Sequence, residues 1–160
     1  MMNKPLVAYF SASGVTARLA DKLAAVTGAQ SYAIQPETPY TTEDLDWTNK
    51  QSRSTIEMND RTFRPPVAGK LSEMEQYDVI FLGFPIWWGV APTVVNTFLE
   101  QHDLNGKTIG PFATSGSSGM GNTNAELAPS CPGADLKAGK RFAASASEGE
   151  LKDWVDSLGL

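Results

Sequence analysis

The sequence predicts an α/β fold: a three-layer, doubly wound parallel sheet with helices on both faces. Two observations support this. Short apolar runs alternate along the chain with segments whose apolar residues recur at helical spacing. Three of the runs are also followed directly by an unusual loop, rich in small polar residues or in tryptophan. Because crossovers between parallel strands are right-handed, all three loops are expected at the same edge of the sheet.

The first strand is predicted at Leu6–Phe10, a short apolar run that ends in turn residues. A helix follows from Val15 to Thr27, and Gly28 is typical of its C-terminal cap. The strongest strand, Val79–Phe84, is apolar at every position, which predicts a central place in the sheet. The other predicted elements are strands at Gln30–Gln35, Lys107–Ala113 (interrupted by Gly110-Pro111) and within Ala134–Phe142, and helices at Thr93–Gln101, from Asn124 to Leu127, and at Glu148–Leu158.

Residues 36–77 depart from this alternation. Pro36 and Pro39 interrupt the chain, and Thr41 and Asp44 have the spacing of a capping box, which predicts a mostly surface-lying helix from about Glu43 to Asp60. We expect an ordered excursion from one edge of a single domain that spans residues 1–160, because the segment has too few apolar residues for a core of its own.

Composition limits the functional classes. The 160 residues carry a formal charge of −5 with a pI near 4.8, which argues against nucleic acid and anionic membranes as partners. No apolar run has the length of a membrane span, and the start lacks the pattern of a signal peptide, so we expect a cytoplasmic protein. Cys131 and His102 are the single residues of their kinds, and no metal is expected.

The loop from Ser11 to Thr16 joins the first strand to the first helix. A helix N-terminus presents free N–H groups and the positive end of the helix dipole, which suits a phosphate. Hydroxyl groups at both ends of the loop add donors, and Gly14 lets the backbone approach a ligand closely. Taken alone, the loop is equally compatible with an ordinary capped helix.

The other two loops are Pro85–Gly89, which contains Trp87 and Trp88, and Ser115–Gly119. Adjacent indoles in a loop either pack on the protein or await a flat ligand, and neighbours cannot easily share one face of a ligand. Together the three loops predict a ligand with a phosphate at one end and a flat aromatic ring at the other.

Other phosphate-binding patterns fit less well. The first loop has no lysine where a nucleoside-triphosphate loop requires one, and it lacks the glycine spacing of a dinucleotide fingerprint. Phosphorylated receiver domains need acidic residues where this chain has Ser11 and Phe84-Pro85.

Instead, Ser11-Ala12-Ser13-Gly14-Val15-Thr16 resembles the flavodoxin phosphate loop, and the loops at 85–89 and 114–119 resemble the two that line the flavin. The resemblance extends over Lys4–Leu158 and implies a five-stranded sheet in the order 2-1-3-4-5. It implies non-covalent FMN held by Ser11, Ser13, Gly14, Val15 and Thr16 at the phosphate, by Pro85, Ile86, Trp87, Trp88 and Gly89 at the isoalloxazine, and by Ser115, Gly116, Ser117 and Gly119 at its pyrimidine side.

Two features depart from many flavodoxins: the third loop has no aromatic residue, and the 36–77 excursion is long. The expected function is electron transfer through FMN to a redox partner protein. The alternatives are an NAD(P)H-dependent FMN oxidoreductase that reduces quinones or similar small acceptors, and a phosphate-binding module without redox chemistry. We expect no catalytic side chain, because the loops contain no evident general acid.

Overall fold

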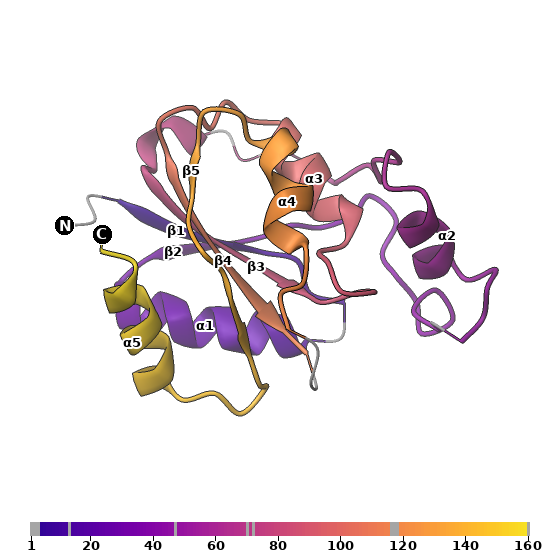
Figure 1. Ribbon diagram of the computed structural model, residues 1–160, viewed down its shortest axis with the longest axis horizontal. Helices are drawn as coiled ribbons and strands as arrows, with labels where there is room; N and C mark the ends of the chain where they lie inside the picture. The colour runs from indigo at the N-terminus through magenta and orange to yellow at the C-terminus, as the bar shows by residue number, and fades with distance from the viewer. Residues whose placement is uncertain are drawn as a thin grey trace.

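The computed structural model describes residues 4–12, 14–46, 48–69, 71, 73–115 and 119–159. It has three layers, with a twisted parallel sheet between two layers of helices (Figure 1). The strand order is β2-β1-β3-β4-β5, with the short β6 also paired to β4, so the predicted fold class and order are confirmed.

The strands are close to their predicted positions. They are β1 (Pro5–Tyr9), β2 (Gln30–Ala33), β3 (Val79–Pro85), β4 (Thr108–Thr114), β5 (Asp135–Leu136) and β6 (Lys140–Phe142). The helices are α1 (Val15–Thr27), α2 (Arg53–Asn59), α3 (Thr93–Glu100), α4 (Thr123–Leu127) and α5 (Glu148–Ser157), with short 3₁₀ turns η1 (Met74–Gln76) and η2 (Ala128–Ser130).

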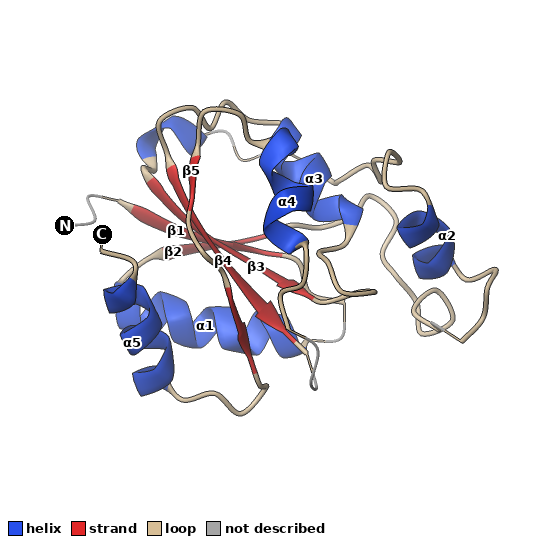
Figure 2. Ribbon diagram, viewed as in Figure 1, coloured by secondary structure: helices blue, strands red, loops and turns tan. Residues whose placement is uncertain are grey.

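Helices cover both faces of the sheet, as Figure 2 shows. One face buries residues of α1 and α5, such as Leu19 and Trp154, against Phe81 and Phe112. The other face buries residues of α3, such as Phe98, against β3 and its neighbours. Because β3 is covered on both sides, its apolar side chains are buried at both alternations, as its sequence predicts.

The edge of the sheet beside β4 differs from the prediction. Two short strands, β5 and β6, pair with β4 there in place of one. The Ile109 carbonyl accepts a hydrogen bond from the Lys137 N–H on this side of β4. Backbone groups two residues apart point to the same side of a strand, so the backbone of Pro111 also points away from β3. Proline has no N–H to donate, and the pairing stops between β5 and β6 at this point. A Cβ on Gly139 would lie 2.9 Å from the Pro111 carbonyl oxygen, so glycine allows the link between β5 and β6 to pass close to β4. β4 itself is continuous through Pro111, and the predicted interruption was wrong.

The predicted helix at 43–60 was also wrong. Thr41 and Asp44 do form the reciprocal bonds of a capping box, but only turns follow them, and the helix α2 begins at Arg53 after its own cap, Ser52. The capping signal is therefore local. Too few apolar residues follow Asp44 to bury one face of a longer helix.

The excursion is fastened to the sheet domain at its base and along its return. A β-bridge joins Pro36 to Val67, and the Ala68 N–H donates to Gln35 across the same neck. Further along, the Arg61 guanidinium donates to the Ala91 carbonyl at 3.1 Å. These contacts hold α2 beside the carboxyl ends of the strands, at the right of Figure 1.

We expect Gly83→Ala to destabilise the protein by about 1–3 kcal/mol, the usual effect of overpacking a core. Gly83 pairs with Phe112 in the sheet, and a Cβ on it would overlap the buried Phe112 ring. Urea denaturation measures the change. Gly149→Ala is the matched control, because that position in α5 is uncrowded and helical, so alanine should be neutral or stabilising. Equal stability of the two variants would contradict this packing.

Candidate functional site

The loop after β1 leads directly into α1, so the N–H groups of the first helical turn point back toward the loop. Gly14 caps the helix at a φ of 91°, a conformation that favours glycine. Its N–H donates to the Ser11 hydroxyl at 3.0 Å, which fixes the loop. The N–H groups of the first helical residues, from Val15 on, have no acceptor four residues back within the helix. No acidic residue occupies the first turn, so nothing there competes with an anion.

The Thr16 hydroxyl is buried and pairs with the Thr114 hydroxyl from the end of β4, at 2.7 Å. One bridge between two hydroxyls uses one of their two protons. The second proton is therefore left to donate to a ligand, and the pair ties the first loop to the third.

Two cations border these loops, and the sequence analysis missed both. The Arg18 guanidinium lies beside the loop, within 3.5 Å of the position a Cβ on Gly14 would take. Arg141 of β6 donates to the Ser115 hydroxyl at 3.1 Å and to its carbonyl at 2.7 Å. Arg18 was detectable, since it lies one turn along the helix from Gly14, whereas Arg141 reaches the site only through the pairing of β6 with β4.

The loop after β3 is a tight hairpin. The N–H of Trp87 donates to the Val90 carbonyl, and the reverse bond is also made. Trp88 and Gly89, at the tip, both have positive φ, 50° and 81°, as in a type I′ turn. Trp88 is the one described non-glycine residue with positive φ, and a bulky residue there is strained.

The two tryptophans have different surroundings. The Trp87 ring makes edge contacts with Phe10 and Tyr40, at centroid distances of 5.8 and 5.3 Å. The Trp88 side chain is 49% exposed. One indole therefore packs on the protein with one side, and the other is half-exposed at the tip of the hairpin.

A pocket of about 400 Å³ opens between these loops. Its lining comes from α1, from the loops after β3 and β4, and from the segment after β6: Val15, Pro85, Ile86, Trp87, Thr114, Ser115, Ala143 and Ala144. The structure thus brings the three predicted loops together and adds a fourth, which has no motif to reveal it. The predicted residues Ser13, Gly116 and Ser117 lie outside the described residues, and Gly119 is exposed.

The third loop touches the Trp88 hairpin through Gly121, where a Cβ would overlap the Gly89 carbonyl oxygen. Only glycine permits this approach, so the loops after β3 and β4 are in direct backbone contact at Gly89 and Gly121.

A buried polar cluster in the excursion supports the Trp87 side. The Tyr40 hydroxyl donates to Glu57, whose other oxygen accepts from Arg53 at 2.8 Å. Burial, followed by the hydrogen bond to Glu57, raises the pKa of the Tyr40 hydroxyl, so it remains a protonated donor. The Arg53 guanidinium also lies 3.8 Å over the Tyr40 ring. This cluster fixes the ring against which Trp87 packs.

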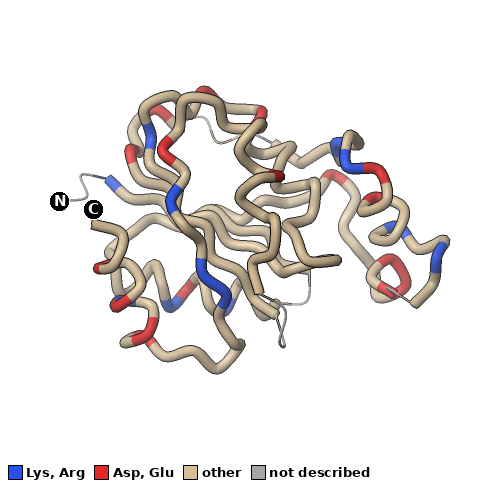
Figure 3. Tube along the Cα trace, viewed as in Figure 1, with Lys and Arg blue, Asp and Glu red and all other residues tan. Residues whose placement is uncertain are grey.

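Charged residues also gather on α2, on α5 and at the amino ends of the strands (Figure 3). Within the described residues no three His, Cys, Asp or Glu side chains come together as metal ligands, and no helix is long and apolar enough to cross a membrane. Burial raises the pKa of the Cys131 thiol, which keeps it protonated.

Comparison with known proteins identifies a family with matching sequence. The flavodoxin family profile matches residues 4–158. The chain belongs to the flavodoxin family. A search among curated proteins gives no match.

Several solved structures resemble this flavodoxin-family chain. A protein assigned as a flavoprotein from Bacteroides eggerthii is 48% identical, with 98% of each chain covered and a TM-score of 0.93. One from Bacteroides uniformis is 46% identical, with 98% of this chain and 99% of that chain covered and a TM-score of 0.91. A flavoprotein from Lactobacillus acidophilus, solved in complex with FMN, shares the fold at 19% identity, with coverage of 98% and 99% and a TM-score of 0.73.

We expect Trp88→Asn to be more stable than Trp88→Ala by about 1 kcal/mol. Both changes remove the indole, but asparagine tolerates positive φ and Asn-Gly is the preferred pair in a type I′ turn. Chemical denaturation of the two variants gives the difference. Variants of equal stability would show that the hairpin relaxes to another turn and stores no strain.

Proposed function

We propose that this chain binds FMN without a covalent bond in the pocket between the loops after β1, β3, β4 and β6, and that it works as an electron-transfer protein. The observation that carries the proposal is the first turn of α1, whose N–H groups from Val15 on have no acceptor within the helix. Val15 also lines the same pocket as Trp87. The neighbour solved with FMN has the same fold.

The phosphate end of FMN fits the donors present. Ser11, Ser13, Gly14, Val15 and Thr16 would hold it, and the second proton of the Thr16–Thr114 pair gives a hydroxyl donor at the helix start. The Arg18 guanidinium, beside Gly14, would offset part of the phosphate charge.

The ring end fits the other loops. Pro85, Ile86, Trp87, Trp88 and Gly89 would contact the isoalloxazine, and Ser115, Gly116, Ser117 and Gly119 its pyrimidine side. Arg141, which holds Ser115 by its hydroxyl and its carbonyl, would position the backbone of this third loop.

FMN supplies the redox chemistry when it is bound, and the protein tunes it. The described lining of the pocket contains no Asp, Glu, His, Cys or Lys side chain, so it offers no group that titrates near neutral pH to deliver a proton to a substrate. This favours the transfer of electrons between proteins.

A second candidate is an NAD(P)H-dependent oxidoreductase that reduces small acceptors. The half-exposed Trp88 and an additional apolar pocket beside it support this alternative, because a carrier that only touches other proteins needs no such pocket.

We expect Thr16→Ala to weaken FMN binding by roughly tenfold or more and to leave riboflavin binding nearly unchanged. A hydrogen bond to a charged group contributes about 1.5–3 kcal/mol to binding. Riboflavin has no phosphate, so it does not make this bond and its affinity should not change. Quenching of flavin fluorescence on binding measures both affinities.

Two control variants separate the phosphate contact from the structural one. Thr27→Ala removes a hydroxyl at the far end of α1, which donates to the Leu23 carbonyl at 2.8 Å, and should leave FMN affinity unchanged. Thr114→Val breaks the hydroxyl pair but leaves Thr16, and should cost less than Thr16→Ala. Equal losses for FMN and riboflavin in Thr16→Ala would place the phosphate elsewhere.

Anaerobic reduction of the FMN-loaded protein distinguishes the two candidate functions. A carrier should take up its two electrons in two separate stages, because the second adds negative charge to a protein whose net charge is already −5. Gly89→Ala places a Cβ at a position with a φ of 81°, where it is strained, and should narrow the separation between the potentials of the two reduction stages. Absorbance during titration with dithionite follows the stages. A single stage, together with reduction by NADPH within seconds, would favour the oxidoreductase, and a purified protein without flavin absorbance or FMN affinity would contradict both.

A further inference from the structure

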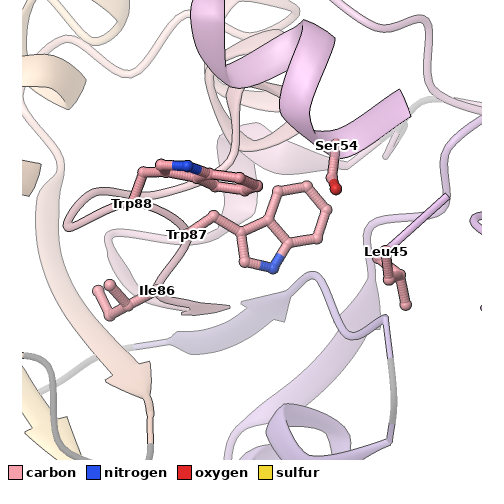
Figure 4. A pocket seen from close by; sticks show the side chains of 5 residues that line it. All are labelled: Leu45, Ser54, Ile86, Trp87 and Trp88. Atoms are coloured by element: carbon pink, nitrogen blue, oxygen red, sulfur yellow. The ribbon is translucent and has the colours of Figure 1, made fainter. Parts of the chain in front are cut away.

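A second pocket, of about 280 Å³, lies where the excursion meets the hairpin after β3. Its five lining side chains are Leu45, Ser54, Ile86, Trp87 and Trp88 (Figure 4). It shares Ile86 and Trp87 with the first pocket, so one layer of side chains separates the two. Ile86, Trp87 and Trp88 belong to the loop that the proposed FMN site also uses, whereas Leu45 and Ser54 come from the excursion and have no part in that site.

Ser54 carries an unused hydroxyl at this pocket. The residue is 2% exposed, and its oxygen has no hydrogen-bond partner within the described part of the chain. Its neighbours differ, because the hydroxyls of Ser52 and Thr55 bond to each other at 2.9 Å. The Ser54 N–H donates to the Asp44 carbonyl at 2.9 Å, which fixes the residue in place. A buried polar group without a partner is unfavourable, and a ligand atom that bonds to it removes the penalty.

The rest of the described lining is apolar and consists of two flat indoles and two aliphatic side chains. In Figure 4 the two indoles stand on one side of the pocket, with Ser54 and Leu45 across from them. None of the described residues that line the pocket is charged, so an ionised ligand would find no partner for its charge among them.

We propose that this pocket binds a small, neutral aromatic carbonyl compound, with its ring between the indoles and Leu45 and its carbonyl oxygen accepting from the Ser54 hydroxyl. At about 280 Å³ the pocket is just below the range of about 300 Å³ or more that drug-sized ligands occupy, so its volume suits a smaller ligand of one or two fused rings. The half-exposed Trp88 side chain forms the movable wall, because it lies outside the buried core.

The proposal is independent of FMN binding. If FMN binds as proposed, the pocket places an acceptor of this class one side-chain layer from the flavin site, and so gives the oxidoreductase alternative a substrate class.

The test uses two probes of similar shape, 2-acetylnaphthalene and 2-ethylnaphthalene, of which only the first has a carbonyl. Isothermal titration calorimetry measures both affinities on the full chain saturated with FMN, and again without FMN. Ser54→Ala should lower the affinity for the ketone by about three- to tenfold and leave the hydrocarbon unchanged. Trp88→Ala should lower both affinities.

Ser52→Ala, which removes a neighbouring hydroxyl that already has a partner, should leave the ratio of the two affinities as in the parent. Ser54→Ala should also lose no stability against urea, because its hydroxyl makes no bond. Absence of ketone binding, an unchanged ratio in Ser54→Ala, or displacement of the ketone by FMN would each overturn the proposal. FMN affinity, measured separately, tells this failure apart from a failure of the proposed cofactor site.

Discussion

The first turn of α1 lies at the edge of the sheet with N–H groups that have no acceptor within the helix, and much of the proposed site depends on them. Gly14 turns the chain into the helix at a φ that other residues avoid, and Ser11 anchors that turn. Because β1 and β3 are neighbours whose connections leave in opposite directions, the turn opens into a crevice between diverging loops. The Thr16–Thr114 hydroxyl pair then fixes the third loop to the helix start.

The excursion adds a wall that the sheet alone cannot provide. Its neck is closed by the Pro36–Val67 bridge, and its interior is held by the Glu57 carboxylate between Tyr40 and Arg53. A buried carboxylate needs both partners, because a charge without them would be costly inside the protein. The cluster therefore specifies one arrangement of the segment, and that arrangement sets Tyr40 against Trp87.

The sequence was informative wherever one local signal decides the structure. Apolar runs located the central strands, and the order of three loops predicted the family and the edge where they meet. It failed where the outcome depends on distant contacts. The helix expected from Glu43 does not form because its turns find no apolar surface to cover. Arg141 reaches Ser115 only through strand pairing, and the exposure of Trp88 depends on the packing of its neighbour Trp87. Neither of these leaves a pattern in the chain.

The break in the last strand position has a consequence beyond the fold. The outer edge of a sheet presents unpaired backbone groups that can capture a strand from another molecule, which is a common start of aggregation. Here Pro111 splits that edge into the two short pieces β5 and β6, and Lys137 and Lys140 follow along it. A neighbouring molecule therefore meets a short, kinked edge that carries charged side chains, among them the Lys137–Asp135 ion pair, and a long intermolecular ladder has no room to grow on it.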